Sequence, residues 1–171
     1  MKKIETPFSE EVIADLKVGD VVSISGYIFC GRDAVLPRIC KELEAGTWSE
    51  RGIDLQGGVI FHTAVSPAGV GPTSSNKLEI EGSFEVLSKL GGIKMHLGKG
   101  AIKPETVKML SDNNAVFAII PPVTALLGSQ TLERECVAWP KLGMEALYRI
   151  RVKNYQAIIA AANGRSIYGN E

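Results

Sequence analysis

Three short turns place a basic side chain where an apolar segment ends. Arg32 follows the first such segment, Lys99 lies between two glycines after another, and Lys77 follows the turn at positions 71–76. Cations beside free backbone N–H groups bind carboxylates, and a ligand with two carboxylates needs more than one cation. The pattern therefore indicates a site for a small dicarboxylate rather than a packed core.

Two of these turns lead into predicted helices. Asp33 is the expected N-cap of one helix, and Asn76 resembles part of a capping box before the next. Each helix start adds the positive end of a helix dipole to a neighbouring cation, which favours an anion. The residues alone leave two other interpretations open. Arg32 is then a surface residue paired with an acid, and the hydroxyl residues at positions 73–75 are ordinary capping groups.

The composition indicates one compact domain, 1–171, because a chain of 171 residues buries roughly two-thirds of its unfolded surface around a single core. Lys and Arg together number 19, as do Asp and Glu, so the formal net charge is zero. This balance argues against nucleic acid or anionic lipid as a partner, and no stretch reaches the roughly 18 apolar residues of a membrane span. Because no apolar signal-peptide core follows the basic residues at positions 2–3, a cytoplasmic location is expected.

The three cysteines are Cys30, Cys40 and Cys136, an odd number that cannot be fully paired within one chain. Their spacing matches neither the usual zinc nor the usual ferredoxin ligand patterns. We expect three reduced, buried thiols and no metal ligands in this chain.

Apolar segments separated by glycine and proline alternate between strand and helix patterns, which indicates the α/β class. The expected helices begin near residues 9, 33, 76 and 104, with a short further helix at 123–130. The expected strands are 21–29, 58–65, 93–97, 115–120, 135–139, 147–152 and 157–161. An irregular loop is expected at 66–69, so the predicted site turns connect strands to helices.

Polar residues on two of the predicted strands are interpreted as exposed faces. Lys94 and His96 lie two apart on one strand face, a pattern more typical of a half-exposed polar face than of a ligand pair. Arg149 and Arg151 share a face in the same way and are interpreted as solvated. None of the four belongs to the expected site.

The order and spacing of the three turns, together with the segment Leu-Gly-Met-Glu-Ala at 142–146, resemble the class I fumarate hydratases. The chain is similar to their beta subunit, which is the C-terminal domain in single-chain members, from about Pro7 to Tyr168. The resemblance implies a swivelling β/β/α domain, with a mixed sheet or open barrel flanked by helices, that moves as a block against a partner. It also implies that this chain is half of an enzyme.

In the family that the chain resembles, the middle turn reads Gly-Pro-Thr-Thr and lies over the substrate. The matched residue is Thr73, so the resemblance implies that Thr73 contacts the substrate and is the candidate for the proton-transfer step, which needs strong local activation of a hydroxyl. It also implies that Arg32, Lys77 and Lys99 bind the substrate. Lys77 stands where the family has arginine, and a mobile point charge thereby replaces a bidentate carboxylate contact.

The resemblance implies a hydro-lyase, namely the beta subunit of an enzyme that reversibly hydrates fumarate to (S)-malate in the tricarboxylic acid cycle. It further implies a 4Fe-4S cluster bound by a partner alpha subunit, no cofactor on this chain alone, and a heterotetramer of two alpha and two beta chains. One alternative is the beta subunit of an L-tartrate dehydratase or mesaconate-type hydratase. Another is a non-catalytic binding or scaffold module with the same fold.

Overall fold

Five strands of the chain close into a barrel at the centre of the fold. The computed structural model describes residues 1–31, 34–66, 69–73, 77–98, 102–120 and 131–166, without the side chains of 64–66, 69–73 and 77–81. The barrel strands are β2 (Val21–Cys30), β3 (Val59–Phe61), β6 (Met95–Gly98), β7 (Val116–Ile119) and β9 (Leu147–Ala162). The first four pair in parallel in that order, and β9 runs antiparallel to both β7 and β2, which closes the ring.

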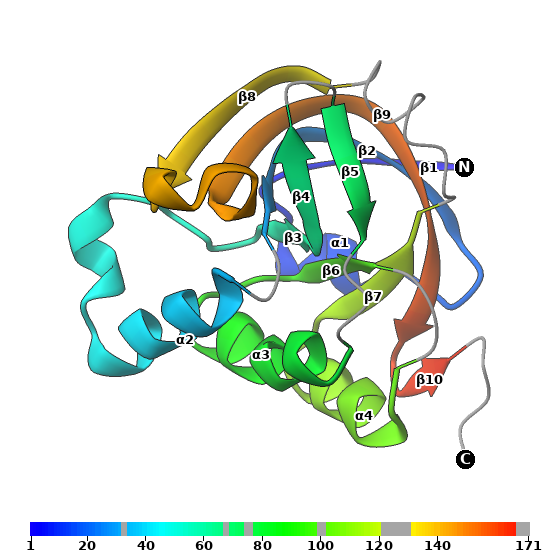
Figure 1. Cartoon of the computed structure of the whole chain (residues 1–171). Helices are drawn as coiled ribbons and strands as arrows, with labels where there is room; N and C mark the ends of the chain where they lie inside the picture. Colours follow the sequence, from blue (N-terminus) through cyan, green and yellow to red (C-terminus); the bar gives the residue numbers. More distant parts are fainter. Residues whose placement is uncertain (32–33, 67–68, 74–76, 99–101, 121–130, 167–171) are drawn as a thin grey trace.

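Apolar side chains that alternate along the strands fill the barrel. On β3, Val59 and Phe61 belong to the interior cluster, whereas Ile60 packs in the cluster outside the barrel. Met95 and Leu97 of β6 repeat the inward pattern, as the two-residue period of a strand requires. The long strand β9 curves around the barrel (Figure 1). Because β2, β3, β6 and β7 are parallel, all four end at one edge of the barrel.

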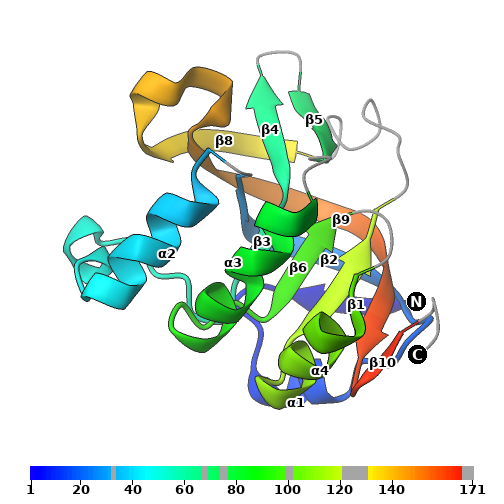
Figure 2. The same cartoon turned by 60° about the horizontal axis from the view of Figure 1, so that its bottom comes forward.

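Three helices lie side by side on the outside of the parallel strands (Figure 2). They are α2 (Leu36–Ala45), α3 (Lys77–Lys89) and α4 (Pro104–Asp112), with α3 packed between the other two. A short helix, α1 (Glu10–Ala14), begins after Ser9, whose hydroxyl accepts the backbone N–H of Val12 as an N-cap. Its Ile13 joins the barrel cluster. Figure 2 shows α1 at the end of the barrel opposite the hairpin of β4 and β5.

Shorter elements surround the barrel. Strand β1 (Lys2–Glu5) pairs with β2, and strands β8 (Thr131–Ala138) and β10 (Arg165–Ser166) pair with β9. Strands β4 (Thr63–Ser66) and β5 (Gly69–Thr73) form a separate hairpin. Two 3-10 turns, η1 (Trp48–Arg51) and η2 (Pro140–Glu145), complete the set of described elements. Within the described ranges, none of the helices combines the length and the hydrophobicity that crossing a membrane requires.

The predicted mixed sheet flanked by helices is confirmed, and the β2–β9 pairing closes the barrel. The two strands predicted at 147–152 and 157–161 are one strand, β9. The polar residues Lys153 and Asn154 that separate them form a bulge opposite β2 rather than a turn, with Asn154 at φ 56°. The ladder therefore continues through them.

Three further predictions need correction. Helix α2 begins after Val35, which has no side-chain capping bond, so Asp33 is not its N-cap; Pro37 presets the first turn and lacks an N–H that needs a cap. The strand predicted at 58–65 divides at His62, where the chain leaves the barrel and enters the hairpin. β5 begins inside the loop expected at 66–69. The helix predicted at 123–130 lies outside the described residues.

Candidate functional site

The carboxyl ends of the four parallel strands meet at one edge of the barrel, here called the carboxyl edge. Cys30 of β2 pairs there with Phe61 of β3, and Phe61 pairs with Leu97 of β6. Two backbone bonds extend this ladder, from the N–H of Gly31 to the carbonyl of Phe61 and from the N–H of His62 to the carbonyl of Leu97, both 3.0 Å. Ligands of parallel sheets bind outside such ends, so the topology favours a site at this edge.

The hairpin of β4 and β5 rises from the carboxyl edge (Figures 1 and 2). Thr63, the first residue of β4, follows His62 directly and pairs with Thr73, the last residue of β5. Helix α3 then begins at Lys77. The pairing of the hairpin therefore returns the chain to the carboxyl edge before α3 starts.

Of the four residues predicted for the site, Arg32 and Lys99 lie outside the described residues. The described residue before each of them lies at the carboxyl edge, at the ends of β2 and β6. The backbone of Thr73 and Lys77 is described, whereas their side chains are not. The structure thus brings the described residues beside the three predicted turns, Gly31, Thr73 and Gly98, to one edge, and the roles of the four side chains stay predictions.

A buried stack of rings lies on the outside of β3 and β6, under α3. The ring centroids of His62 and His96 are 5.6 Å apart, and Phe84 of α3 lies 4.9 Å from the first and 4.1 Å from the second. The hydroxyl of Ser88 is 2.9 Å from Nε2 of His96. Within the described part of the chain, neither ring nitrogen of His62 has a hydrogen-bond partner, nor does Nδ1 of His96. The half-exposed face predicted at Lys94 and His96 is therefore wrong, because the helices cover it and bury both residues.

Both histidines of the stack are neutral. Burial lowers the pKa of His62 to about 3, and burial together with the neighbouring His62 lowers the pKa of His96 well below its usual 6.5. A neutral imidazole offers one donor and one acceptor, and leaving such a buried group unpaired costs about 1–3 kcal/mol. His62 was not predicted as a functional residue. The available signal was a polar residue within the apolar run 58–65.

The opposite edge of the barrel, here called the amino edge, contains a buried residue that is fully engaged. Lys94 lies just before β6, and its Nζ is 2.7 Å from Oε1 of Glu10 and donates to the carbonyl of Asn113 at 3.2 Å. Asn114 also donates to Glu10 through its side-chain amide. The hydrogen bond from Lys94, followed by that from Asn114, lowers the pKa of the Glu10 carboxyl. These contacts join α1 to the turn between α4 and β7.

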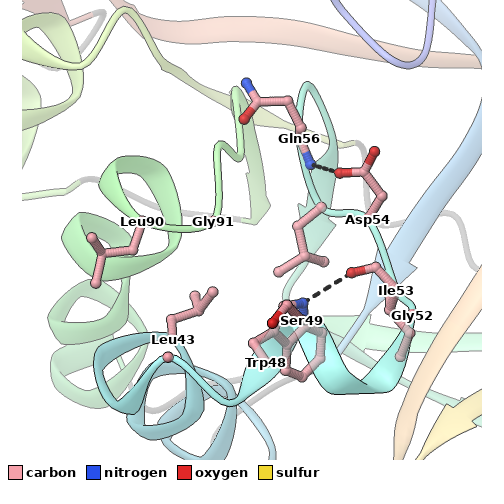
Figure 3. A pocket seen from close by; sticks show the side chains of 11 residues that line it. Leu43, Trp48, Ser49, Gly52, Ile53, Asp54, Gln56, Leu90 and Gly91 are labelled. Carbon is pink, nitrogen blue, oxygen red and sulfur yellow. Dashed lines mark hydrogen bonds between the residues drawn. The ribbon is translucent and has the colours of Figure 1, made fainter.

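A groove of about 590 Å³ also lies toward the amino edge, before the starts of β3 and β6 (Figure 3). Trp48 and Leu90 contribute to its lining. Its Trp48 indole donates to the carbonyl of Ile53 at 3.0 Å, and its Asp54 carboxylate accepts the backbone N–H of Gln56 at 2.9 Å. These polar groups make local bonds, and none of the described residues that line the groove is a predicted site residue. The groove is therefore separate from the candidate site.

The cysteines are dispersed over three elements. Cys30 and Cys40 are buried, whereas Cys136 is exposed on β8, so the expectation of three buried thiols is wrong for Cys136. Burial raises the pKa of Cys40 to about 11 and also raises that of Cys30, so both stay protonated thiols. Among the described residues, no three His, Cys, Asp or Glu side chains gather as metal ligands. An iron–sulfur cluster does not fit on this described part of the chain.

Known proteins resemble this chain over nearly its whole length. The family described as Fumarase C-terminus matches residues 2–171. The L(+)-tartrate dehydratase subunit beta of Escherichia coli (strain K12) is 32% identical, over 94% of this chain and 83% of that subunit. A putative L(+)-tartrate dehydratase subunit beta of Methanocaldococcus jannaschii is 29% identical, over 91% of this chain and 85% of that protein. A putative fumarate hydratase class I of Geobacillus stearothermophilus is 27% identical over 96% of this chain, which is 33% of that protein.

These matches include the barrel, the hairpin and the sequences of all three predicted turns. They agree with the resemblance that the order and spacing of the turns indicated. The chain belongs to the Fumarase C-terminus family.

Proposed function

We propose that this chain is the beta subunit of a two-subunit hydro-lyase for a small dicarboxylate, with the reversible hydration of fumarate to (S)-malate as the leading reaction. The observation that carries the proposal is that the described residues beside all three predicted turns lie at the carboxyl edge. There, the chain before Arg32, the chain before Lys99 and the end of β5 at Thr73 all lie beside the ladder of parallel strands. The family match supports the reaction class.

The proposed roles follow from the charge of the substrate. Hydration adds a hydroxyl group to one carbon of the double bond and a proton to the other, while both carboxylates stay negative. Arg32 is proposed to bind one carboxylate through two parallel hydrogen bonds, and Lys77 and Lys99 to add positive point charges. Thr73 is proposed to move the proton, because neighbouring positive charge makes a hydroxyl easier to ionise.

The other half of the proposed enzyme is an alpha subunit. The related proteins named as beta subunits support a partner chain, and we propose two alpha and two beta chains. Because the described residues offer no ligand set for a metal centre, we assign the 4Fe-4S cluster of the proposed enzyme to the alpha subunit. The free thiols of Cys30, Cys40 and Cys136 support the proposed cytoplasmic location.

L-tartrate dehydration is the second candidate reaction, and the names of the relatives from E. coli and M. jannaschii favour it. The reaction class is the same, since water leaves a 2-hydroxy diacid. Lys77 bears on this choice, because a mobile ammonium adapts to a substrate with an additional hydroxyl more readily than a planar guanidinium does. Mesaconate, which is fumarate with one additional methyl group and the same charge, is a further candidate substrate.

The test is an anaerobic assay of this chain alone, of its candidate alpha subunit with an intact cluster, and of the two together. Fumarate, mesaconate and L-tartrate are offered in separate reactions, and loss or gain of the double bond is followed by absorbance. Activity only in the mixture is expected, and the substrate with the highest kcat/KM identifies the reaction. Equal activity of this chain alone would contradict the two-subunit proposal. Silence of the mixture on all three substrates would favour a non-catalytic binding or scaffold module.

A further inference from the structure

His62 is a buried residue whose hydrogen-bonding groups are unused. Its side chain is 1% exposed, and within the described residues neither Nδ1 nor Nε2 has a partner. Native proteins pair the large majority of buried side-chain polar atoms, so each exception needs a physical account. His62 is such an exception at both nitrogens of its ring.

Packing alone does not explain an imidazole at this position. The ring lies against Phe84 at 4.9 Å and His96 at 5.6 Å, contacts that a phenyl ring would also make. A phenylalanine at position 62 would avoid the cost of removing two polar atoms from water, about 1–3 kcal/mol for an unpaired group. The imidazole therefore lowers stability, and polar groups that do so are concentrated at functional sites.

The position of His62 connects it with the β4–β5 hairpin and with α3, the elements that carry two of the four predicted site residues, Thr73 and Lys77. Its backbone N–H donates to Leu97 at the end of the barrel ladder, and the next residue, Thr63, pairs with Thr73. Its ring contacts Phe84, which lies about two helical turns after Lys77 on α3. His62 is thus the residue at which the barrel, the root of the hairpin and α3 meet.

We infer that His62 is a positioning residue of the proposed site, whose imidazole makes a hydrogen bond in the assembled, substrate-loaded enzyme that the described residues of this chain leave unmade. That bond fixes the root of the β4–β5 hairpin against α3 and so fixes Thr73, the residue proposed to move the proton. The inference rests on the proposed function. Because the bond acts on the proton-transfer step, its loss lowers kcat more than it raises KM.

The test compares His62→Phe with Tyr155→Phe in the complex of this chain with its alpha subunit. Both variants keep an aromatic ring and remove buried polar atoms, but the Tyr155 hydroxyl is bonded to Thr131 inside the fold. For His62→Phe we expect a kcat about 10- to 100-fold lower, a KM within about twofold, and a melting temperature at or above that of the original chain. For Tyr155→Phe we expect an unchanged kcat and a melting temperature about 2–4 °C lower.

A conservative replacement separates positioning from packing. The amide of His62→Gln supplies a donor and an acceptor, so it should recover part of the kcat that His62→Phe loses. Normal kcat in His62→Phe would overturn the inference, as would equal losses in the phenylalanine and glutamine variants. A fall in kcat that follows the melting temperature across all variants would also overturn it, since that pattern indicates a structural role.

A second readout keeps the inference testable if the complex is inactive on every substrate, which would contradict the proposed function. The chain has only two histidines, so long-range ¹⁵N spectra of the imidazoles resolve both rings. His62 is then assigned by its absence in His62→Phe. Adding the alpha subunit with fumarate or L-tartrate should shift the His62 nitrogens to hydrogen-bonded values. An unchanged His62 spectrum in the assembled complex would overturn the inference.

Discussion

Lys94 and His62 lie at opposite edges of the same barrel, and the fold treats these two buried polar residues in opposite ways. At the amino edge, the Lys94 ammonium has the Glu10 carboxylate at 2.7 Å and the Asn113 carbonyl at 3.2 Å. At the carboxyl edge, the ring of His62 lies 4.9 Å from that of Phe84 and, among the described residues, has no hydrogen-bond partner. The amino edge is thus completed by the chain itself.

This difference separates stability from the proposed chemistry. A buried charge with its partners in place joins α1 to the turn after α4, and its loss should affect folding without affecting catalysis. An unpaired imidazole beside the hairpin gives no stability, and its loss should affect catalysis without affecting folding. Each variant below changes a residue at one of the two edges.

The largest effect is expected from Lys77→Ala at the carboxyl edge. Losing one of the cations proposed to bind the dicarboxylate should lower kcat/KM of the complex about 10²- to 10³-fold, or about 3–4 kcal/mol. Lys89→Ala removes an exposed lysine at the other end of the same helix and serves as the matched control. We expect its kcat/KM and the folding of both variants to be normal. A Lys77→Ala enzyme with normal kcat/KM would show that the carboxyl edge does not bind the substrate through this residue.

The pH dependence of stability is expected to reveal the histidine stack. Because the pKa of His62 is about 3 in the folded chain and about 6.5 when unfolded, the unfolded chain alone takes up a proton between these values. Stability therefore falls as the pH is lowered below about 6.5, by about 1.4 kcal/mol per pH unit for each buried histidine. His62→Phe should lose about half as much stability as the original chain between about pH 7 and about pH 5.

The measurement for this prediction is the free energy of unfolding in urea across that pH range. Glu10 has the opposite kind of shift: its pKa is lowered, so its contribution is lost only as the pH falls through its folded value, below the usual 4.5. The two edges are thereby separated by pH as well as by position. Identical pH profiles of His62→Phe and the original chain would show that His62 is not held neutral.

A smaller loss of stability is expected from Glu10→Gln at the amino edge. The buried Lys94 ammonium then keeps the Asn113 carbonyl but loses its carboxylate, which should lower the free energy of unfolding by about 1–2 kcal/mol. Lys94→Met replaces the charge with an apolar side chain of similar length and should cost less than Glu10→Gln. Both variants should retain normal kcat in the complex. A catalytic defect in either would contradict the division between the two edges.

The sequence predicted the alternation of apolar segments better than it predicted where a strand ends. Runs of apolar and β-branched residues identified the barrel strands, and the helix expected to begin near residue 9 is confirmed as α1 (Glu10–Ala14). Asn154 was read as a break, because the sequence does not show that a neighbouring strand accommodates the extra residue as a bulge. Pairing partners distant in the chain decide such cases.

The sequence predicted the turns of the candidate site but not the buried polar residues near the barrel edges. Glycine and basic residues at positions 31–32 and 98–100 identify turns locally, and the parallel register brings the ends of the strands before them, β2 and β6, to one edge. The burial of His62, Lys94 and His96 depends on α3 and α1 covering the sheet, which is a tertiary contact with no local signal. The sequence therefore indicated a half-exposed face at Lys94 and His96.

The smallest effect is expected from Lys77→Arg, which keeps the charge at the carboxyl edge and changes only its geometry. A guanidinium binds a carboxylate with two parallel hydrogen bonds, whereas an ammonium is a compact point charge on a flexible stem. Stability should be unchanged, and the ratio of kcat/KM for fumarate to that for L-tartrate should rise by about two- to tenfold, because the rigid fork adapts less well to the additional hydroxyl. The ratio is measured in the same complex with both substrates. An unchanged ratio with a lower kcat/KM for both would mean that Lys77 contributes to binding and not to substrate choice, so that the selectivity of the carboxyl edge would have to come from its other residues.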